Sequence, residues 1–294
     1  MSVVAVARPG ADNAARLRRQ AFRERINVFL RTPTAVVGLF VLIFWVLCAV
    51  FAGQVAPHDP IAPDILHKLL PPGGAHPFGT DSLGRDVLSR VIFGSRGILL
   101  VAPLATLLGT VVGTAIGLIA GYFRGIVEEV LMRITDAFLS LPGIIVALLA
   151  LVALGNSVQT VILVIGLSFA PIIARTVRAA VLSETQLDYV QAARLRQERA
   201  PYVMFVEILP NVLSPVLVEF TVRLGYAIFA TATLSFLGFG IPPPAPDWGL
   251  TISEQYSYLI SNLWWPTLFP ALAIASLVVA VNLVADGLSQ ALER

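Results

Sequence analysis

Long apolar runs, separated by shorter polar stretches, dominate the pattern of this chain. A helix needs about twenty apolar residues to cross the hydrocarbon layer of a bilayer. Six runs approach that length and predict transmembrane helices at about 35–52, 98–122, 130–154, 158–174, 212–237 and 267–288. No alternation of polar and apolar positions is long enough to predict a barrel. We therefore expect an all-α membrane protein with six transmembrane helices.

One polar stretch, residues 188–211, differs sharply from the apolar runs on both sides of it. It is charged and helix-prone, and Pro201 suits the first turn of a second helix. Residues 183–186, Ser-Glu-Thr-Gln, fit a capping box that starts a helix. A polar segment between membrane-length runs must lie in water, where a soluble partner can reach it. We interpret this segment as the functional contact of the protein with a soluble partner.

The positions of the arginines predict which side of the membrane each connection faces. Arginines are dense in residues 1–34 and around the connection between the fourth and fifth spans, whereas residues 239–266 contain no basic residue. Both termini and the 188–211 segment are therefore expected in the cytoplasm. The predicted organisation is a cytoplasmic segment 1–34, a first transmembrane helix 35–52, an extracytoplasmic loop 53–96 that ends in a helix at about 81–93, and a five-helix core 97–294 with a cytoplasmic loop at about 179–211.

The composition supports a membrane protein and excludes several chemistries. Only 13% of residues are charged and the mean hydropathy is +0.83, whereas soluble domains carry about 25% charged residues. The net charge of +2 does not indicate nucleic-acid binding. Lys68 is the only lysine and lies in no phosphate-binding P-loop frame. If the protein uses ATP, the nucleotide is hydrolysed on another chain.

The three histidines, His58, His67 and His76, lie at equal intervals in the 53–96 loop. Imidazole is a common metal ligand, but equal spacing along a proline-rich loop does not define a coordination geometry. We see no acidic or cysteine cluster that joins them. We expect surface histidines and no metal site.

Ionisable residues within the predicted spans are costly and face a cavity or a partner. Glu219 and Arg223 lie four residues apart, on one face of the fifth span and within pairing distance. They either line a translocation path and hold a zwitterionic or peptide substrate, or pair with each other or with a second subunit for packing. Asp136 is expected to pair with Arg133. Pro142 is expected to interrupt the third span.

Several separated motifs carry a resemblance to one family of transporters. They comprise His76-Pro77-Phe78-Gly79-Thr80-Asp81 with Gly84-Arg85-Asp86, Met132-Arg133-Ile134-Thr135-Asp136, residues 188–211, Leu234-Ser235-Phe236-Leu237-Gly238 with Asp247-Trp248-Gly249, and Trp264-Trp265 with Asp286-Gly287. Together they resemble the inner-membrane permease subunits of dipeptide, oligopeptide and nickel ABC importers, specifically the second permease of the pair. The resemblance implies the type I ABC importer permease fold and a multi-pass location in a bacterial inner membrane.

In that family a cytoplasmic E-A-A-x-x-x-G pattern forms a short helix that sits in a groove of the ATPase. Here the pattern falls on Gln191, Ala192, Ala193 and Gln197, with glutamine at the acidic and glycine positions. Since glutamine favours a continuing helix, we expect the bend after this helix later, where Pro201 restricts Ala200. The residues expected to couple to the ATPase are Asp188, Tyr189, Gln191, Ala192, Ala193, Arg194 and Gln197.

The resemblance also implies partners and a function. The partners are a second permease in a heterodimer, two ATPase subunits that bind ATP and magnesium, and an extracytoplasmic binding protein; this chain holds no cofactor. Pro243, Asp247 and Trp248 are expected to contact the binding protein, or to anchor the chain at the membrane interface together with Trp264 and Trp265. The expected substrate is a di- or oligopeptide, with nickel, glutathione or another small solute as alternatives.

Two other classes fit less well. An ion-coupled secondary transporter would need no large cytoplasmic docking loop. An intramembrane serine or zinc protease would need a histidine at membrane depth or an H-E-x-x-H motif, and the sequence has neither. We therefore expect a transport subunit without enzymatic activity of its own.

Overall fold

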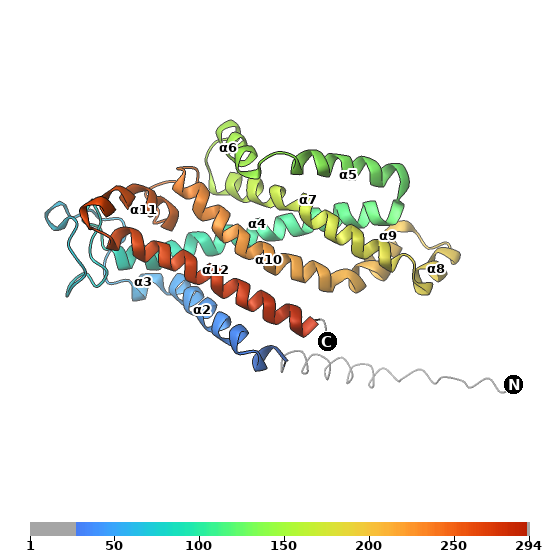
Figure 1. The fold of residues 1–294 in the computed structure, drawn as a ribbon, viewed down its shortest axis with the longest axis horizontal. Coiled ribbons are helices and arrows are strands. Elements are labelled where there is room, and N and C mark those ends of the chain that lie inside the picture. Colours follow the sequence, from blue (N-terminus) through green and yellow to red (C-terminus); the bar gives the residue numbers. More distant parts are fainter. Residues whose placement is uncertain (1–27, 293–294) are drawn as a thin grey trace.

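The computed structural model describes residues 28–292, and the regular structure in that range is helical, without a β-strand (Figure 1). The all-α prediction is confirmed. Most of the arginine-rich segment 1–34 lies outside the described residues, so its predicted cytoplasmic location stays a prediction.

Within residues 28–292, five helices are long and apolar enough to cross a membrane. They are α2 (Pro33–Val50), α4 (Val87–Phe123), α7 (Val158–Glu184), α10 (Leu209–Phe236) and α12 (Trp265–Leu292). α10 continues directly from a short helix α9 (Ala200–Tyr202) and a π-helical turn η2 (Val203–Ile208), which lengthens that span to Ala200–Phe236. These helices correspond to five of the six predicted spans.

The third predicted span is two helices rather than one. α5 (Gly125–Leu139) and α6 (Gly143–Leu154) meet at a bend of 88°. Pro142 stands at the N-cap of α6 with φ −59° and ψ 115°. A proline cannot donate the backbone hydrogen bond that would continue α5. The described part of the chain therefore has six spans only if this bent pair counts as one.

α4 corrects the prediction for the 81–123 region. We expected a loop helix at 81–93 and a separate span from residue 98, but one helix of 37 residues runs through both. Gly94 and Gly97 lie within this helix, and each removes a side chain where a neighbour approaches: a Cβ would lie 2.5 Å from the Trp248 ring at Gly94 and 2.3 Å from Ile241 at Gly97.

α4 packs closely against α7 along a row of glycines spaced four residues apart. A Cβ on Gly109 would lie 2.6 Å from the carbonyl oxygen of Gly166, and one on Gly113 would lie 2.7 Å from that of Ala170. Gly117 and Gly121 continue the row against Val177 and Val181. Small residues at a helix interface allow two backbones to approach closely inside a membrane. This pair forms the centre of the bundle.

Two ion pairs join the polar face of α5 to α7. Arg178 donates from Nε to Oε1 of Glu128 at 2.6 Å, and Arg175 pairs with Asp136. The expected local pair of Asp136 with Arg133 is wrong, because Arg133 instead lies 4.0 Å from Glu129, a weak and exposed contact. The sequence cannot indicate a partner that comes from a helix 39 residues away.

The bundle has two polar ends. One holds the 53–86 loop with α3 (Ala52–Val55) and η1 (Ile65–His67), next to α11 (Trp248–Gln255) and η3 (Tyr256–Ser261). α8 (Asp188–Leu195) and α9 lie at the other end (Figure 1). α2 runs away from the α8 end and α12 runs back toward it. The start of α2 and the end of α12 therefore lie on the α8 side of the bundle; that this side is cytoplasmic, and where the chain ends outside residues 28–292 lie, stay predictions.

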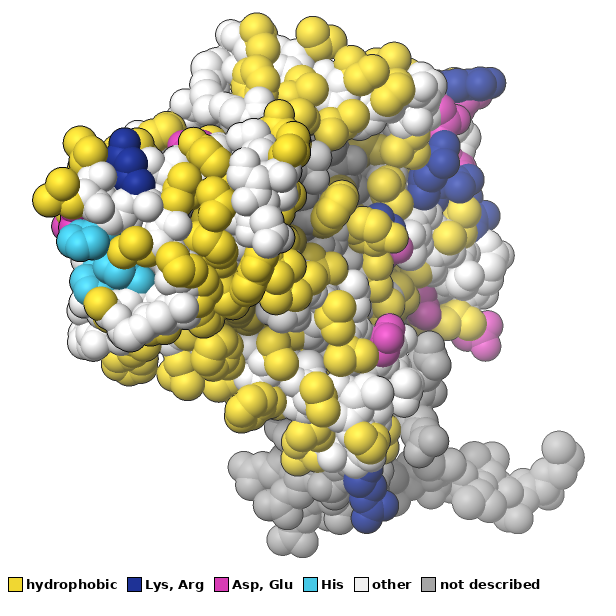
Figure 2. Space-filling view, turned by 60° about the vertical axis from the view of Figure 1, so that its left-hand side comes forward, with side chains coloured by type: hydrophobic (Ala, Val, Ile, Leu, Met, Phe, Trp, Pro, Cys, Tyr) yellow, Lys and Arg dark blue, Asp and Glu magenta, His cyan; other side chains and the backbone are white. Residues whose placement is uncertain are grey.

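Between these ends the surface is strongly apolar. Figure 2 shows hydrophobic side chains across the middle of one face, with the histidines at one end and most of the visible arginines at the other. Phe40 and Phe229, for example, are 73% and 61% exposed. Two buried clusters lie beneath this surface. One surrounds Trp45 and Trp248 near the 53–86 loop, and the other packs Val190 and Ala193 of α8 against α7 and η2.

Candidate functional site

α8 presents one buried and one exposed face. Val190 and Ala193 are fully buried. Asp188, Gln191, Ala192 and Leu195 follow an i, i+3, i+4, i+7 pattern and form the exposed face. Leu195 is 85% exposed, which is unusual for a leucine anchored in a short, well-packed helix. The inner face therefore fastens α8 to its own chain and leaves the outer face free for another protein.

The end of α8 corrects the prediction for Gln197. α8 ends at Leu195, and Gln197 adopts a left-handed conformation with φ +58°. The backbone N–H of Gln197 donates to the carbonyl of Arg194 at 2.9 Å, and that of Glu198 donates to Ala193 at 3.2 Å. These two bonds define a Schellman motif. The bend thus occurs at the family's glycine position and not at Ala200, and the bonds offset the roughly 1–2 kcal/mol cost of a left-handed residue.

The start of α8 also differs from the prediction. α7 continues to Glu184, and α8 follows Leu187 without a side-chain cap, so residues 183–186 do not form the expected capping box. Instead, the side chain of Gln191 donates from Nε2 to the carbonyl of Thr185 at 2.8 Å, next to the end of α7. A glutamate carboxylate has no hydrogen to donate there. The glutamine at the family's acidic position therefore makes a bond that the usual residue could not.

Tyr189 joins three helices at the base of α8. Its hydroxyl donates to Oε2 of Glu184 at 2.5 Å and accepts from Nδ2 of Asn211 at 3.1 Å. Burial, together with the hydrogen bond to Glu184, raises the pKa of Tyr189 to about 12. Nearby, the Arg194 guanidinium lies 4.9 Å from the ring centroid of Tyr122 in α4. α8 is thus held to α4, α7 and α10 together.

Glu219 and Arg223 form the pair that their spacing predicts. Nε of Arg223 lies 3.0 Å from Oε2 of Glu219, and their side chains are only 17% and 16% exposed. The hydroxyl of Thr176 in α7 donates to the other carboxylate oxygen at 2.9 Å. The Arg223 guanidinium also lies 5.3 Å from the centroid of the Tyr226 ring. Thr176 is a partner that the sequence did not indicate, since it belongs to a different helix.

A cavity of 430 Å³ lies beside the bend between α5 and α6. Residues of the bend, α7 and α10 line it, among them Phe138, Ile144, Phe169, Phe229 and Thr233. The described residues that line it carry no charge, and Glu219 and Arg223 are not among them. The predicted path residues therefore do not line this cavity.

The turn before α11 contains residues predicted to contact a binding protein. Trp248 is 2% exposed and donates from Nε1 to the carbonyl of Val91 at 2.8 Å. Asp247 caps α11 by accepting from the Leu250 N–H at 2.8 Å and also accepts from the Ser235 hydroxyl at 3.0 Å. Burial raises its pKa. These two side chains support the turn from inside, whereas Pro243 is exposed.

The motif of residues 76–90 fastens the 53–86 loop to α11. Asp81 accepts the backbone N–H groups of Leu83 and Arg85, each at 2.9 Å. Arg85 bridges from Asp81, at 2.6 Å, to Glu254, at 3.0 Å. Gln255, fully buried, bonds the backbone and side chain of Ser82. The loop therefore has a defined conformation that these side-chain bonds hold against α11.

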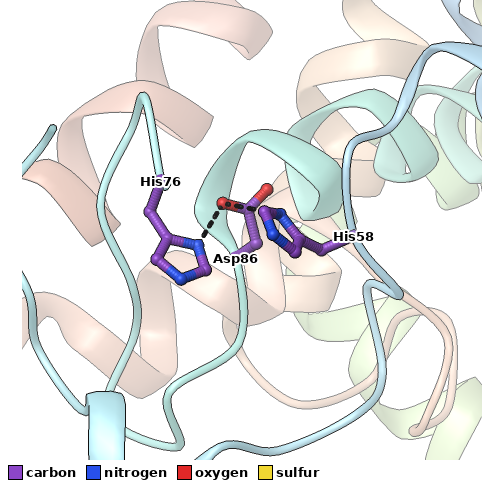
Figure 3. Close-up of side chains that lie close together, drawn as sticks. All are labelled: His58, His76 and Asp86. Carbon is purple, nitrogen blue, oxygen red and sulfur yellow. Dashed lines mark hydrogen bonds and ion pairs between the residues drawn. The ribbon is translucent and has the colours of Figure 1, made fainter. Parts of the chain in front are cut away.

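The histidines do not behave as isolated surface residues. His67 pairs with Asp64 at 2.7 Å, and this hydrogen bond lowers the pKa of the Asp64 carboxyl. His58 and His76 instead converge on Asp86 (Figure 3). The expectation that no acidic group joins the histidines is wrong for this pair. The sequence contained part of the information, since His76 and Asp86 belong to one motif. The position of His58 beside them depends on the fold.

Comparison with known proteins identifies the family. The family described as the binding-protein-dependent transport system inner membrane component matches residues 113–294, and the N-terminal TM domain of oligopeptide transport permease C matches residues 19–72. The chain belongs to this family of inner membrane transport components. It is a multi-pass inner membrane permease, as its apolar helices also indicate.

Relatives of this permease cover nearly its full length. The dipeptide transport system permease protein DppC of Escherichia coli K12 is 41% identical over 273 residues, which cover 91% of each chain. The di/tripeptide transport system permease protein DppC of Pseudomonas aeruginosa is 37% identical, covering 90% of this chain and 89% of the relative. The inward-facing MetNI methionine ABC transporter shares the fold, with a TM-score of 0.57 at 21% identity over 70% of this chain and 97% of that one.

Proposed function

We propose that this permease imports short peptides with energy from ATP hydrolysed on a separate chain. The geometry of α8 carries the proposal: a short helix with a fully anchored inner face and an exposed outer face that includes Leu195. The two DppC relatives, whose names specify dipeptides and di/tripeptides, support the substrate class.

In this proposal the exposed face of α8 docks in a groove of the ATPase. Ala192 allows the partner backbone to approach closely, and the exposed side chain of Leu195 supplies apolar surface that a partner can bury. Asp188 in the first turn and Arg194 in the last match the helix dipole and flank the contact. ATP and magnesium are bound by the two ATPase subunits. A second permease subunit completes the membrane-spanning unit as a heterodimer.

The proposed orientation places α8 and both termini in the cytoplasm. The 53–86 loop and the turn around Pro243 then face the outside, where a peptide-binding protein delivers its cargo. Arginines are dense in residues 1–34 and around α8, and they are absent from residues 239–266, which supports this orientation. Pro243 is the exposed member of the proposed docking turn.

Glu219 and Arg223 are the proposed charged elements of the translocation path. Their side chains keep about one sixth of their surface exposed in the single chain, and their opposite charges suit the two termini of a zwitterionic peptide. The specific observation in favour of a purely structural role is the bond from Thr176, which adds a third member to the network. The path role and the structural role predict different effects of substitution on transport.

Transport in proteoliposomes tests the coupling proposal. The chain is reconstituted with its second permease, ATPase subunits and binding protein, and uptake of a labelled dipeptide is measured with ATP or with a proton gradient. We expect uptake with ATP alone. Uptake driven by the proton gradient would support a secondary transporter instead, and uptake of nickel or glutathione in place of the dipeptide would change the substrate class.

Ala192→Asp and Leu195→Asp probe the contact with the ATPase. Both are exposed, so we expect the chain to fold and to retain the second permease while losing ATPase co-purification and uptake. Gln186→Asp, at an exposed position just outside α8, is the matched control and should keep both. Unchanged co-purification and uptake in the two α8 variants would exclude α8 as the docking element.

The Glu219→Gln, Arg223→Gln double variant separates the two roles of the charged pair. A lower affinity for dipeptide during uptake, with normal assembly, is expected for path residues. Normal uptake with an unchanged range of substrates would leave only the packing role.

A further inference from the structure

Three potential metal ligands converge at the start of α4. His58 follows α3, His76 lies in the turn 18 residues later, and Asp86 is the N-cap of α4. Nδ1 of His76 is 2.9 Å from Oδ1 of Asp86, and Nδ1 of His58 is 3.8 Å from the same oxygen. The two imidazole centroids are 4.7 Å apart, and Figure 3 shows both rings directed at the carboxylate.

The carboxylate at the centre of this cluster is held in place by other bonds. Oδ2 of Asp86 accepts both the backbone N–H and the hydroxyl of Ser89, each at 2.7 Å. The same hydroxyl accepts the backbone N–H of His58 at 3.1 Å. Oδ2 is therefore committed to the helix cap, and Oδ1 is left to face the imidazoles. Hydrogen bonds that fix the orientation of the ligands are typical of metal sites in proteins.

We propose that His58, His76 and Asp86 bind a divalent transition-metal ion of the zinc type. Two ligands bound to zinc at about 2.0–2.2 Å with tetrahedral angles lie about 3.3–3.6 Å from each other. The two nitrogen–oxygen distances, 2.9 and 3.8 Å, lie on either side of that range. One ligand atom from each of the three residues lies within 4.8 Å of the others, so small side-chain rotations complete the arrangement.

The donor types select the class of metal. Two imidazole nitrogens and one carboxylate oxygen suit zinc and its neighbours, whereas magnesium and calcium prefer oxygen ligands alone. Three protein ligands leave at least one coordination position open. The Asp86 side chain is fully buried, His76 is 18% exposed and His58 is 40% exposed. The site is therefore open on the His58 side, where the ion enters and where water or a group from another molecule completes its coordination.

A bound ion would join two parts of the loop to the start of α4. It would connect the chain after α3, the turn at His76 and the helix cap, which otherwise meet through a few hydrogen bonds. An ion that binds only the folded arrangement stabilises it in proportion to the logarithm of its concentration. The inference is independent of the cargo and of ATP coupling, since the cluster lies at the end of the bundle opposite α8 (Figure 1).

Metal binding is tested on the assembled full-length complex, purified through an affinity tag that contains no histidine. Isothermal titration with Zn²⁺ measures affinity, and absorption spectra with Co²⁺ report whether nitrogen and oxygen donors bind it. We expect one site in the complex that is lost or weakened at least about a hundredfold in His58→Ala and His76→Ala. The Co²⁺ spectrum of the complex should disappear in both variants.

His67→Ala is the matched control, because His67 lies in the same loop but pairs with Asp64 outside the cluster. It should bind Zn²⁺ like the unmodified complex. Asp86→Asn retains an oxygen that can cap α4 but lowers the donor strength, and should weaken binding while the metal-free complex melts at a nearly unchanged temperature. The proposal is overturned if the unmodified complex binds no equivalent of Zn²⁺, or if all four variants bind it with equal affinity.

Discussion

Ala192 and Ala193 are neighbours in sequence, but they lie on different faces of α8. Ala193 is fully buried against the core of its own chain, and Ala192 is exposed. The pair that resembles a single motif therefore serves two purposes. The inner alanine sets the distance between α8 and the bundle, and the outer one determines how closely another protein can approach.

This arrangement predicts different effects of the same substitution at the two positions. Ala193→Leu should destabilise the chain by about 1–3 kcal/mol, since extra volume in a packed site forces neighbours to move. Ala192→Leu should change stability by less than about 0.5 kcal/mol. Denaturant unfolding of the detergent-solubilised protein measures both. Equal losses at the two positions would show that α8 does not bury only one face.

Gln197 occupies a conformation that favours glycine, so Gln197→Gly should stabilise the turn. The left-handed residue costs about 1–2 kcal/mol, and the extra freedom of glycine in the unfolded chain cancels about half of it. We expect a net gain of roughly 0.5–1 kcal/mol in the free energy of unfolding. Gln197→Ala, which keeps the Cβ, is the control and should give no gain; an equal gain would indicate that the side chain and not the backbone is strained.

The Tyr189 hydroxyl should no longer stabilise the folded chain in strongly alkaline solution. Its pKa is raised from 10 to about 12 in the folded chain, so the unfolded chain releases the proton first. The stabilising effect is fully present below pH 10 and is lost as the pH rises through about 12. Tyr189→Phe should therefore be less stable than the unmodified chain at neutral pH, and this difference should shrink toward pH 12. A difference independent of pH would contradict a role for the hydroxyl proton.

The Glu219–Arg223 pair should show strong coupling in a double-mutant cycle. Removing one partner leaves a poorly hydrated charge, so Glu219→Gln or Arg223→Gln alone should each cost about 1–3 kcal/mol. The double variant should lose less than the sum of the two, by about 0.5–3 kcal/mol. Thr176→Val, which removes the third member without removing a charge, should cost less than either single variant. Additive losses would mean that the two charges do not stabilise each other.

The glycine row of α4 gives a test of helix packing. Gly113→Val would place a Cβ 2.7 Å from the carbonyl oxygen of Ala170 and should cost at least about 1–3 kcal/mol. Gly143→Ala is the control, because no atom lies within 4 Å of a Cβ added there. Assembly and thermal unfolding measure both. Similar stability of the two variants would exclude close contact between α4 and α7.

The apolar runs predicted most of the fold because a membrane-spanning helix must bury nearly all of its length in hydrocarbon. The errors arose where local signals had two physical meanings. Gly94 and Gly97, between the expected loop helix and the expected span, make room for Trp248 and Ile241 within one continuous helix. Gln197 favoured a helix by propensity, but the hydrogen bonds at the end of α8 outweighed that preference.

The candidate site was predictable only in part. The spacing of Glu219 and Arg223 places them on one helix face, and α8 follows from its polar composition. The bonds of Asp136 to Arg175, Thr176 to Glu219, and His58 to the cluster at Asp86 join elements that are distant in sequence. No local pattern indicates such partners. The inward orientation of Trp248 likewise depends on the position of Val91 in α4.

The continuity of α4 links the two polar ends of the protein. At 1.5 Å per residue, its 37 residues span about 55 Å, well beyond the hydrocarbon thickness of about 30 Å. Asp86 at its first turn holds the histidines, and Tyr122 in its last turn contacts Arg194 of α8. Pro103, near the middle of α4, cannot donate a backbone hydrogen bond to the preceding turn. The helix nevertheless continues through it, so a single element positions both the histidine cluster and the α8 contact.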